Sequence, residues 1–355
     1  MTIAVDCRHL ASSGVGVYLR GILPFFLESG NFFYLLGNAE KIRPFACHYK
    51  SVKIIECRIK PFSVNELLFF PGNILKIINS CDLFYTPFFN IPGRLKIPVY
   101  TTIHDLIFHD MPGLTSKTGF FVRNFFYKRA HNVSKKIFTV SEFSKSRITH
   151  HFGDKTPVAV TYSAIQPEFI KYRANAGNTE KKETIVFVGN IKKHKGLGIL
   201  LEAFLLAKKE GLPHKLVIIG EKESFRTADK SVLKKTDLLA SENVFITGFV
   251  SEEQLMEHIC SAALLVQPSL HEGFCLPPLE ALVLGTNALI SDIPVLREIF
   301  GGFPVTFFNA GDTMDLKNKM VNILSQNMTA PELSCDLISK YTFEKTASTI
   351  IKELQ

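Results

Sequence analysis

The sequence of 355 residues contains no apolar stretch long enough to cross a membrane. Hydrophobic residues make up 46% of the chain, yet Lys, Glu, Asn or Pro interrupts every apolar run well before it could span a bilayer. The start, MTIAVDCRHLASSG, has no basic region and reaches Asp6 and Arg8 almost at once, so we expect no signal peptide. We therefore expect a cytoplasmic protein.

Two further absences narrow the class of protein. The seven cysteines include no CxxC pair and stand mostly in apolar surroundings, which indicates reduced thiols buried in a core. No nucleic-acid-binding motif accompanies the formal charge of +8, so nucleic acid is the least favoured of the anionic partners. The charge fits a phosphorylated substrate or an acidic lipid surface better.

The length predicts two domains, each with a core of its own. Short β-branched runs alternate with longer helical patterns, as in parallel βαβ units. The polar stretch 171–183 separates two sets of strands, so we place the domains at 1–175 and 176–338 and expect an amphipathic helix over 339–355. The predicted strands are TIAVD, KIIECRI, DLFYTP, PVYTTIHD and KIFTVS before this stretch, and TIVFVGN, KLVIIG, NVFITGFV, ALLVQPS and NALISD after it.

Two acidic residues, Glu272 and Glu280, lie in HEGFCLPPLEALVLGT, residues 271 to 286. The preceding ALLVQPS predicts a buried strand, and Pro277 or Pro278 suits the first position of a following helix. The helix would then start at the carboxyl edge of a parallel sheet, where ligands bind and free N–H groups attract phosphate. With Glu280 in the first helical turn and Glu272 in the loop, both carboxylates can face one crevice. Because carboxylates repel phosphate and accept hydrogen bonds from hydroxyls, the pattern predicts a ligand with phosphate flanked by polyols.

Two other junctions between a strand and a helix carry similar signals. In TIVFVGNIKKHKGLGILLEAF, Lys195 stands just before the expected helix, placed to meet a pyrophosphate as a point charge; the alternative is a solvated basic loop. In the first loop, Gly14 and Gly16 form a G-x-G whose third glycine is replaced by Leu19. This departure argues against a dinucleotide cofactor but leaves close backbone approach to a ligand open.

The segment TIHDLIFHD places His104 and Asp105 at a strand end, followed by His109 and Asp110. Such residues can bind a metal, but the zinc spacings are absent. A single strand-end histidine more often makes a structural hydrogen bond. Its position at the carboxyl edge of the sheet nevertheless favours a functional role for His104.

The segment 117–138 interleaves basic and aromatic residues. One interpretation is an amphipathic helix that faces an anionic membrane. The alternative is a half-buried helix with a solvated basic face, since aromatic stripes at helical spacing usually pack inward. The residues concerned are Lys117, Arg123, Lys128, Arg129, Lys135 and Lys136, among Phe120, Phe121, Phe125, Phe126 and Tyr127.

Together these segments resemble the family 4 retaining glycosyltransferases of GT-B fold. The resemblance rests on the E-x7-E spacing of Glu272 and Glu280, on the glycine loop, and on the order of the segments along essentially the whole chain. It implies two Rossmann-like domains facing each other across a donor-binding cleft. The C-terminal domain would hold a nucleotide-diphosphate sugar, the acceptor would approach from the N-terminal domain, and the last helix would return to the N-terminal domain. The segments that carry it are HEGFCLPPLEALVLGTNALISDIPVLREI, FVGNIKKHKGLGILLEAF, TIHDLIFHDMPG and FTVSEFSKSRI.

The resemblance also assigns roles by position. Glu280 matches the acid that binds the nucleotide ribose, and Glu272 the acid that contacts the transferred sugar. Lys195 matches the lysine on the diphosphate, and His104 the histidine near the reaction centre. Asn190 stands where the family often has Arg, so neutralisation of the diphosphate would depend more on Lys195, helix dipoles and backbone amides. The implied catalytic residues are His104, Glu272 and Lys195, and the implied donor-binding residues are Gly14, Gly16, Asn190, Lys195, Glu272, Gly273, Phe274, Cys275, Leu276 and Glu280.

By the same resemblance, the reaction is hexose transfer with retention, through same-face attack by the acceptor hydroxyl rather than double displacement. No D-x-D motif is present, so we expect neither a metal ion nor a cofactor. The sequences VGNIKKHKG and SDIPVLREI are similar to the corresponding segments of bacterial polysaccharide mannosyltransferases, which favours GDP-mannose as the donor. The alternative is a UDP- or dTDP-sugar such as glucose or rhamnose.

The expected acceptor is a growing surface glycan, as in lipopolysaccharide O-antigen synthesis, or a glycan linked to polyprenyl diphosphate at the inner membrane. The enzyme would then be cytoplasmic with peripheral attachment to that membrane. Two alternatives belong to other classes. One is a nucleotide-sugar-binding protein without catalysis, and the other is a metal-dependent hydrolase that uses HDLIFHD.

Overall fold

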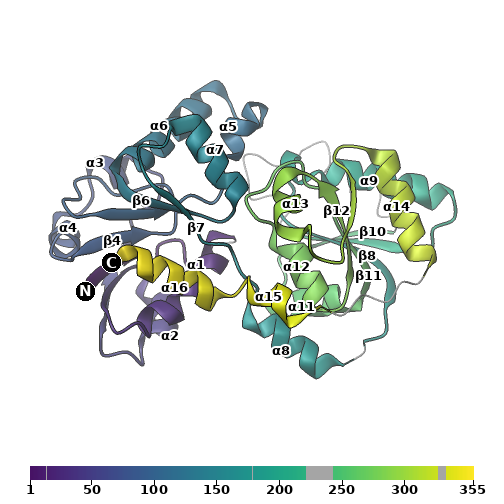
Figure 1. The fold of residues 1–355 in the computed structure, drawn as a ribbon, viewed down its shortest axis with the longest axis horizontal. Coiled ribbons are helices and arrows are strands. Elements are labelled where there is room, and N and C mark those ends of the chain that lie inside the picture. Colours follow the sequence, from purple (N-terminus) through teal and green to yellow (C-terminus); the bar gives the residue numbers. More distant parts are fainter. Residues whose placement is uncertain (13, 178, 221–242, 327–332) are drawn as a thin grey trace. The chain divides into compact units, whose positions relative to one another are not determined.

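The computed structural model describes residues 1–12, 14–177, 179–220, 243–326 and 333–355 (Figure 1). The chain divides into two compact units. The first comprises Met1–Ala164 together with Lys340–Gln355, and the second comprises Ile165–Ser339. Each unit is a parallel sheet flanked by helices, so the sequence-based expectation of two Rossmann-like α/β domains is confirmed.

The first unit is built on a seven-stranded sheet in the order β3-β2-β1-β4-β5-β6-β7. All neighbouring strands are parallel. The sequence analysis missed β2, whose segment FFYLLG shows no apolar alternation, and β7, which has only three residues. The strands are β1 (Thr2–Asp6), β2 (Phe32–Gly37), β3 (Val52–Glu56), β4 (Leu83–Thr86), β5 (Val99–Thr102), β6 (Ser134–Thr139) and β7 (Val158–Val160).

The helices of the first unit include the C-terminal segment, α16, which packs along α1. The side chain of Thr346 on α16 also donates to the Tyr162 carbonyl at 2.6 Å. The basic segment expected to be helical over 117–138 forms a helix only to Val133, and its remainder belongs to β6. The helices are α1 (Val15–Leu27), α2 (Ala39–Ala46), α3 (Val64–Leu68), α4 (Gly72–Ile78), α5 (Ile107–Asp110), α6 (Lys117–Val133), α7 (Glu142–Phe152) and α16 (Phe343–Leu354), with a 3-10 turn, η1, at Pro112–Leu114.

The second unit has a six-stranded sheet in the order β10-β9-β8-β11-β12-β13. Its strands are parallel, and five of them match the predicted runs. The strands are β8 (Lys182–Val188), β9 (Lys215–Ile219), β10 (Val244–Gly248), β11 (Ala262–Gln267), β12 (Asn287–Asp292) and β13 (Thr306–Asn309). The helices are α8 (Pro167–Ala176), α9 (Leu197–Lys209), α11 (Glu252–Ser261), α12 (Leu276–Val283), α13 (Pro294–Phe300), α14 (Thr313–Ser325) and α15 (Cys335–Ser339), with a 3-10 turn, η2, at Lys193–Lys195.

The division between the units falls earlier in the chain than the position after residue 175 that the sequence analysis chose. The polar stretch 171–183 is the end of α8 and the approach to β8, not a linker. Phe169 anchors α8 in the second unit with 1% of its side chain exposed, and α8 packs against α11 and α12. The first part of the stretch that indicated a linker, residues 171–176, therefore belongs to a docked helix.

The structure bears on two features noted in the sequence, the cysteines and the apolar stretches. Six cysteines have described side chains, and all six are free thiols, of which only Cys47 is exposed. Within the described ranges, no helix combines the length and the apolar character needed to cross a membrane.

Candidate active site

The strand order in the sheet of the second unit reverses at β8, which pairs with β9 on one side and β11 on the other. The loops that follow β8 and β11 meet there, since the Leu270 N–H donates to the His194 carbonyl at 2.7 Å. Gly196, with φ +67°, permits this approach, because a Cβ at that position would lie 1.9 Å from the Pro268 oxygen. In open α/β sheets such a switch point is where ligands bind.

An ion pair joins these two loops. Lys195 Nζ donates to both carboxylate oxygens of Glu272, at 2.7 and 2.9 Å, and their side chains are only 20% and 9% exposed. Burial alone would raise the pKa of Glu272, but the charge of Lys195 and the hydrogen bonds from Lys195 and Ser269 lower it below the usual range. The structure thus brings together two residues that lie 77 positions apart in the sequence.

A chain of hydrogen bonds that the sequence analysis did not predict supports Glu272 from β11. Ser269 Oγ donates to Glu272 Oε1 at 2.6 Å, and Gln267 Nε2 donates to Ser269 Oγ at 3.0 Å. Both supporting residues are fully buried. In the sequence, these two residues could have been noticed as the polar Gln and Ser at the end of the apolar run ALLVQPS, which predicts a buried strand.

Helix α12 carries the second acid of the pair. It begins at Leu276, so both prolines fall inside it and Glu280 lies in the second turn rather than the first. The helix starts one residue early because proline tolerates the first turn, where its missing N–H is not needed. The Glu280 carboxyl is buried, and this burial, with a smaller effect from Glu252, raises its pKa to about 8. Glu280 is therefore a neutral acid at pH 7 in this structure.

Cys275 lies between the two acids. It caps α12 with a φ of 79°, a left-handed conformation that is unusual for a residue with a side chain. Burial raises the pKa of its thiol well above the usual value, and the carboxyl groups of Glu272 and Glu280 contribute to the rise. The same loop holds Gly273 and Phe274, which are buried, and α12 begins with the half-buried Leu276. Asn190, in the loop after β8, is also half-buried.

The predicted residues of the first unit lie at the corresponding edge of its own sheet, where β1 pairs with β2 and β4. His104 follows β5, and its Nε2–H donates to the Pro87 carbonyl at 2.9 Å, which leaves Nδ1 as an acceptor. Burial lowers the pKa of His104, so the ring is neutral at pH 7. Gly14 caps α1 with φ 49°, and a Cβ on Gly16 would lie 2.9 Å from the carbonyl oxygens of His9 and Leu10.

His9 is a residue at this edge that the sequence analysis missed. Its ring lies 4.6 Å from that of Phe88, which follows β4, so the two span the switch point of this sheet. Its buried Nε2 has no hydrogen-bond partner among the described residues, and burial lowers its pKa. A buried ring nitrogen without a partner is costly to the fold, and a ligand hydroxyl can supply the missing hydrogen bond. The sequence feature that could have pointed to His9 is its position shortly after the predicted strand TIAVD.

A buried ionic network holds the loop before His9. Arg8 bonds to Asp6 at 2.6 Å and to Glu66 at 2.5 Å, and its guanidinium lies over the Phe70 ring. The other oxygen of Glu66 accepts from Asn90 Nδ2 at 2.7 Å. The ends of β1 and β4 are thereby tied to α3.

The segment HDLIFHD does not assemble a metal site in the described part of the chain. His109 donates to Asn124 at 3.0 Å, while Asp110 accepts from Arg147 at 2.7 Å and from His151 at 2.9 Å. Among the described residues, no three or more His, Cys, Asp or Glu side chains come together as metal ligands would. The hydrolase alternative therefore finds no ligand cluster in these ranges.

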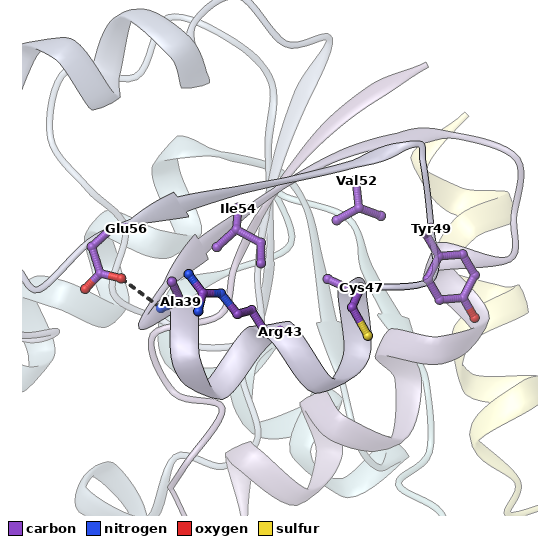
Figure 2. Close-up of a pocket in the computed structure, with 8 residues that line it drawn as sticks. Ala39, Arg43, Cys47, Tyr49, Val52, Ile54 and Glu56 are labelled. Atoms are coloured by element: carbon purple, nitrogen blue, oxygen red, sulfur yellow. Dashed lines mark hydrogen bonds between the residues drawn. The ribbon is translucent and has the colours of Figure 1, made fainter.

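A hollow of about 460 Å³ lies elsewhere in the first unit, between α2 and the edge strand β3 (Figure 2). Its lining includes Arg43, Tyr49 and Glu56, and Glu56 accepts a hydrogen bond from the Ala39 N–H at 2.8 Å. None of the predicted site residues lines it. The hollow lies at the end of the sheet order, away from the switch point between β1 and β4.

Two family profiles match the chain. The one described as "Glycosyl transferases group 1" matches residues 168–339, and the one described as "Glycosyltransferase Family 4" matches residues 12–169. Among solved structures, the Anabaena protein HepE in complex with UDP and glucose has a TM-score of 0.73 at 16% identity, over 100% of this chain and 99% of that one. Sucrose-phosphate synthase from Thermosynechococcus elongatus has the same TM-score at 14% identity, over 100% and 98%. These likenesses confirm the expected GT-B fold.

Curated relatives match parts of the chain. The Escherichia coli serotype-specific mannosyltransferase WbdA is 28% identical over 174 residues, which cover 48% of this chain and 21% of the relative. The E. coli O-antigen chain mannosyltransferase B is 26% identical over 230 residues, which cover 62% of this chain and 59% of the relative. The chain thus spans about a fifth of the first relative and about three fifths of the second.

Removing the cation of the buried pair should destabilise the protein more than removing the whole pair. Lys195→Met leaves the buried Glu272 carboxylate without its cation, so we expect a loss of about 3 kcal/mol in the free energy of unfolding at pH 7. Because the pKa of Glu272 is lowered in the folded state, the pair's contribution is present above its unfolded value of 4.5 and lost as the pH falls through the folded pKa.

Urea unfolding of the second unit in the full chain measures this effect. The double variant Lys195→Met/Glu272→Gln should recover most of the loss, and the cost of the single variant should shrink toward pH 4. Equal losses for the single and double variants at pH 7 would show that the ion pair does not account for the stability.

Glu280→Gln should change how stability depends on pH. A glutamate whose folded pKa is raised from 4.5 to about 8 makes the wild-type protein less stable as the pH rises between those values. The variant should therefore match wild type near pH 4 and be more stable above pH 8, by on the order of 4 kcal/mol. Urea unfolding across this range tests the expectation, with exposed Glu253→Gln as the control. Parallel pH profiles for wild type and Glu280→Gln would contradict it.

Proposed function

This chain belongs to the family 4 glycosyltransferases, and from that membership we propose that it transfers a hexose from a nucleotide-diphosphate sugar to a glycan acceptor, with retention of configuration. The observation that carries the proposal is the junction in the second unit. There the Lys195–Glu272 pair spans the switch point between β8 and β11, next to the start of α12 and the buried acid Glu280. A cation, the positive end of a helix dipole and two carboxyl groups suit the recognition of a sugar diphosphate.

The proposed donor is GDP-mannose. Its support is that WbdA and the O-antigen chain mannosyltransferase B, both related to this chain, are named as mannosyltransferases. A UDP-sugar such as UDP-glucose is the alternative, favoured by the fold of HepE, which was solved with UDP and glucose.

The proposed chemistry uses charge that is already in place. As the nucleoside diphosphate leaves, negative charge develops on its oxygens, and Lys195 with the N-terminus of α12 can stabilise it. Glu272, held by Lys195 and Ser269, would accept hydrogen bonds from the transferred sugar and keep the lysine oriented. The acceptor hydroxyl would attack from the face that the diphosphate leaves, forming the new bond from its oxygen to the sugar as the bond to the diphosphate breaks, and its proton would pass to the departing diphosphate oxygen. The proposed reaction uses no metal ion.

Glu280 would bind the ribose. As a neutral acid it can donate one hydrogen bond and accept others, and two ribose hydroxyls that donate to it would favour its ionised form. Nucleotide binding would then lower the pKa of Glu280 from its value of about 8. A proton would leave the carboxyl group as the nucleotide arrives.

The proposed acceptor is a bacterial surface glycan carried on polyprenyl diphosphate at the inner leaflet of the cytoplasmic membrane. The family name and the O-antigen relatives support a glycan acceptor. His104 would lie near the reaction centre, where its free Nδ1 can accept a hydrogen bond from a sugar hydroxyl. Peripheral attachment to the membrane would bring enzyme and acceptor together.

A panel of nucleotide sugars, screened by thermal shift and by product formation, tests the function. We expect GDP-mannose to stabilise the protein by about 2.7 kcal/mol at a hundred times its Kd, and turnover to persist in EDTA. Lys195→Met should lower kcat/KM at least about tenfold through loss of a charge at the diphosphate, whereas exposed Lys193→Met should not. Stabilisation by a sugar nucleotide without any turnover or donor hydrolysis would favour the binding protein instead, and loss of activity in EDTA would contradict the metal-free reaction.

Binding of GDP should release a proton from Glu280. Isothermal titration calorimetry in buffers of different ionisation enthalpy counts the protons, and at pH 7 we expect nearly one per nucleotide, because most of the free protein carries a neutral Glu280. Affinity should rise with pH up to about 8. Glu280→Gln should bind more weakly and release none, while Glu253→Gln should behave as wild type. Proton release that persists in Glu280→Gln would show that another group titrates.

A further inference from the structure

Two neighbouring elements of the first unit expose large apolar side chains to solvent. On α6 they include Phe121, Val122 and Phe125, and on and just after α3 they belong to Val64, Leu68 and Phe69. Between 48% and 70% of each side chain is exposed. We call these six residues the α3–α6 surface. Exposed apolar residues gathered in this way mark interaction sites in soluble proteins more often than isolated ones do.

The segment that leads into α3 contacts α6. The ring of Phe62, just before α3, lies 4.8 Å from that of Phe126 on α6. Both helices also bind the same loop. The Gly93 N–H donates to the Glu66 carbonyl of α3 at 3.0 Å, and Arg129 of α6 donates to the Ile91 carbonyl at 2.7 Å. The two elements that carry the six apolar side chains are therefore held to the same loop.

The exposed side chains are not left over from an incomplete core. The inner side of α6 is already packed through Phe126, Tyr127 and Ala130, all buried, and α3 is fixed from within by Glu66. Phe121 and Phe125, four residues apart, lie on the outer side of α6. The described fold of the first unit gives them nothing to cover.

The two segments that carry this surface expose basic residues but no acidic one. Segments 57–81 and 111–136 contain a single acidic residue, Glu66, which is fully buried and paired with Arg8. Lys60, Lys117 and Lys128 are exposed in the same segments. Exposed aromatic and aliphatic residues with lysines and without exposed acids are suited to an anionic bilayer, whose headgroups attract the lysines while the apolar side chains enter the boundary with the acyl chains.

The structure changes which basic residues of 117–138 can take part. Arg123 lies 4.1 Å from the Phe108 ring and donates to Thr115 Oγ1 at 3.1 Å, and Arg129 is committed to the carbonyls of Ile91 and Pro92. These two arginines maintain the fold of the first unit. Lys117 and Lys128 remain as the exposed cations of α6.

We propose that the α3–α6 surface docks this protein on an anionic lipid bilayer, with Phe69, Phe121 and Phe125 entering the headgroup boundary. This proposal rests on the proposed function in one respect: docking would bring the enzyme to an acceptor that is carried on a lipid. The surface chemistry stands independently of the sugar that is transferred. Docking through α3 as well as α6 extends the contact beyond the basic helix that the sequence indicated.

Co-sedimentation of the full-length protein with vesicles tests the proposal. We expect binding to vesicles of phosphatidylglycerol and phosphatidylethanolamine at low salt, with at least about tenfold weaker binding to phosphatidylcholine or at high salt. Phe69→Ser/Phe121→Ser/Phe125→Ser should lose at least about tenfold in affinity, because these side chains are exposed and are not needed for folding. Phe249→Ser, at an 83% exposed phenylalanine of the second unit, is the matched control and should bind as wild type.

A second pair of variants tests the charges. Lys117→Ser/Lys128→Ser should weaken binding to anionic vesicles and reduce its salt dependence, whereas Lys41→Ser/Lys50→Ser removes the same charge from exposed positions elsewhere in the unit and should have little effect. Wild-type protein that ignores anionic vesicles, or a triple phenylalanine variant that binds them equally well, would overturn the proposal. So would light scattering that shows a dimer disrupted by the same triple variant, since the surface would then be a protein interface.

The docking proposal and the proposed function can fail separately. If the triple phenylalanine variant still binds GDP-mannose in the thermal-shift assay but no longer binds vesicles, docking is supported and the donor site is intact. If wild-type protein binds no nucleotide sugar yet binds anionic vesicles through these residues, docking stands and the proposed function falls.

Discussion

The ion pair between Lys195 and Glu272 is the interaction on which the second unit's candidate site depends. It joins the loops after β8 and β11 at the point where the sheet order reverses. Both charges are largely buried, so neither is stable there without the other. The pair lowers the pKa of Glu272 and keeps a cation at the sheet edge. A diphosphate arriving there would meet a lysine that is already oriented, which reduces the ordering that binding must impose.

Burial acts on Glu280 in the opposite direction, because among the described residues no cation lowers its pKa as Lys195 lowers that of Glu272. Its pKa of about 8 makes it neutral at pH 7, while Glu272 stays ionised a short distance along the same loop and helix. Two glutamates of one segment therefore have different protonation states, set by their surroundings. In the proposed reaction this difference separates their tasks, since an ionised acid can hold a lysine and a neutral acid can bind a diol and release a proton.

The first unit repeats the same physical arrangement with other residues. At its switch point the network of Arg8, Asp6 and Glu66 fixes the loop that carries His9, and His104 stands beside it as a neutral imidazole. Glu66 serves two purposes in this unit. It completes the buried network, and by being buried it leaves α3 without an exposed acid beside the apolar side chains of the α3–α6 surface.

The sequence by itself determined the α/β class, most of the strands, the strand-turn-helix junctions and the family, because these depend on local periodicity and on short motifs such as the E-x7-E of Glu272 and Glu280. Only the tertiary structure decided that Lys195 binds Glu272, that Glu280 is neutral, that His9 meets Phe88, and that Arg123 and Arg129 serve the fold while Phe121 and Phe125 face solvent. The docked helix α8, mistaken for a linker, belongs to the same group. Pairing, protonation state and exposure all depend on which distant segments surround a side chain, and that is fixed only when the chain is packed.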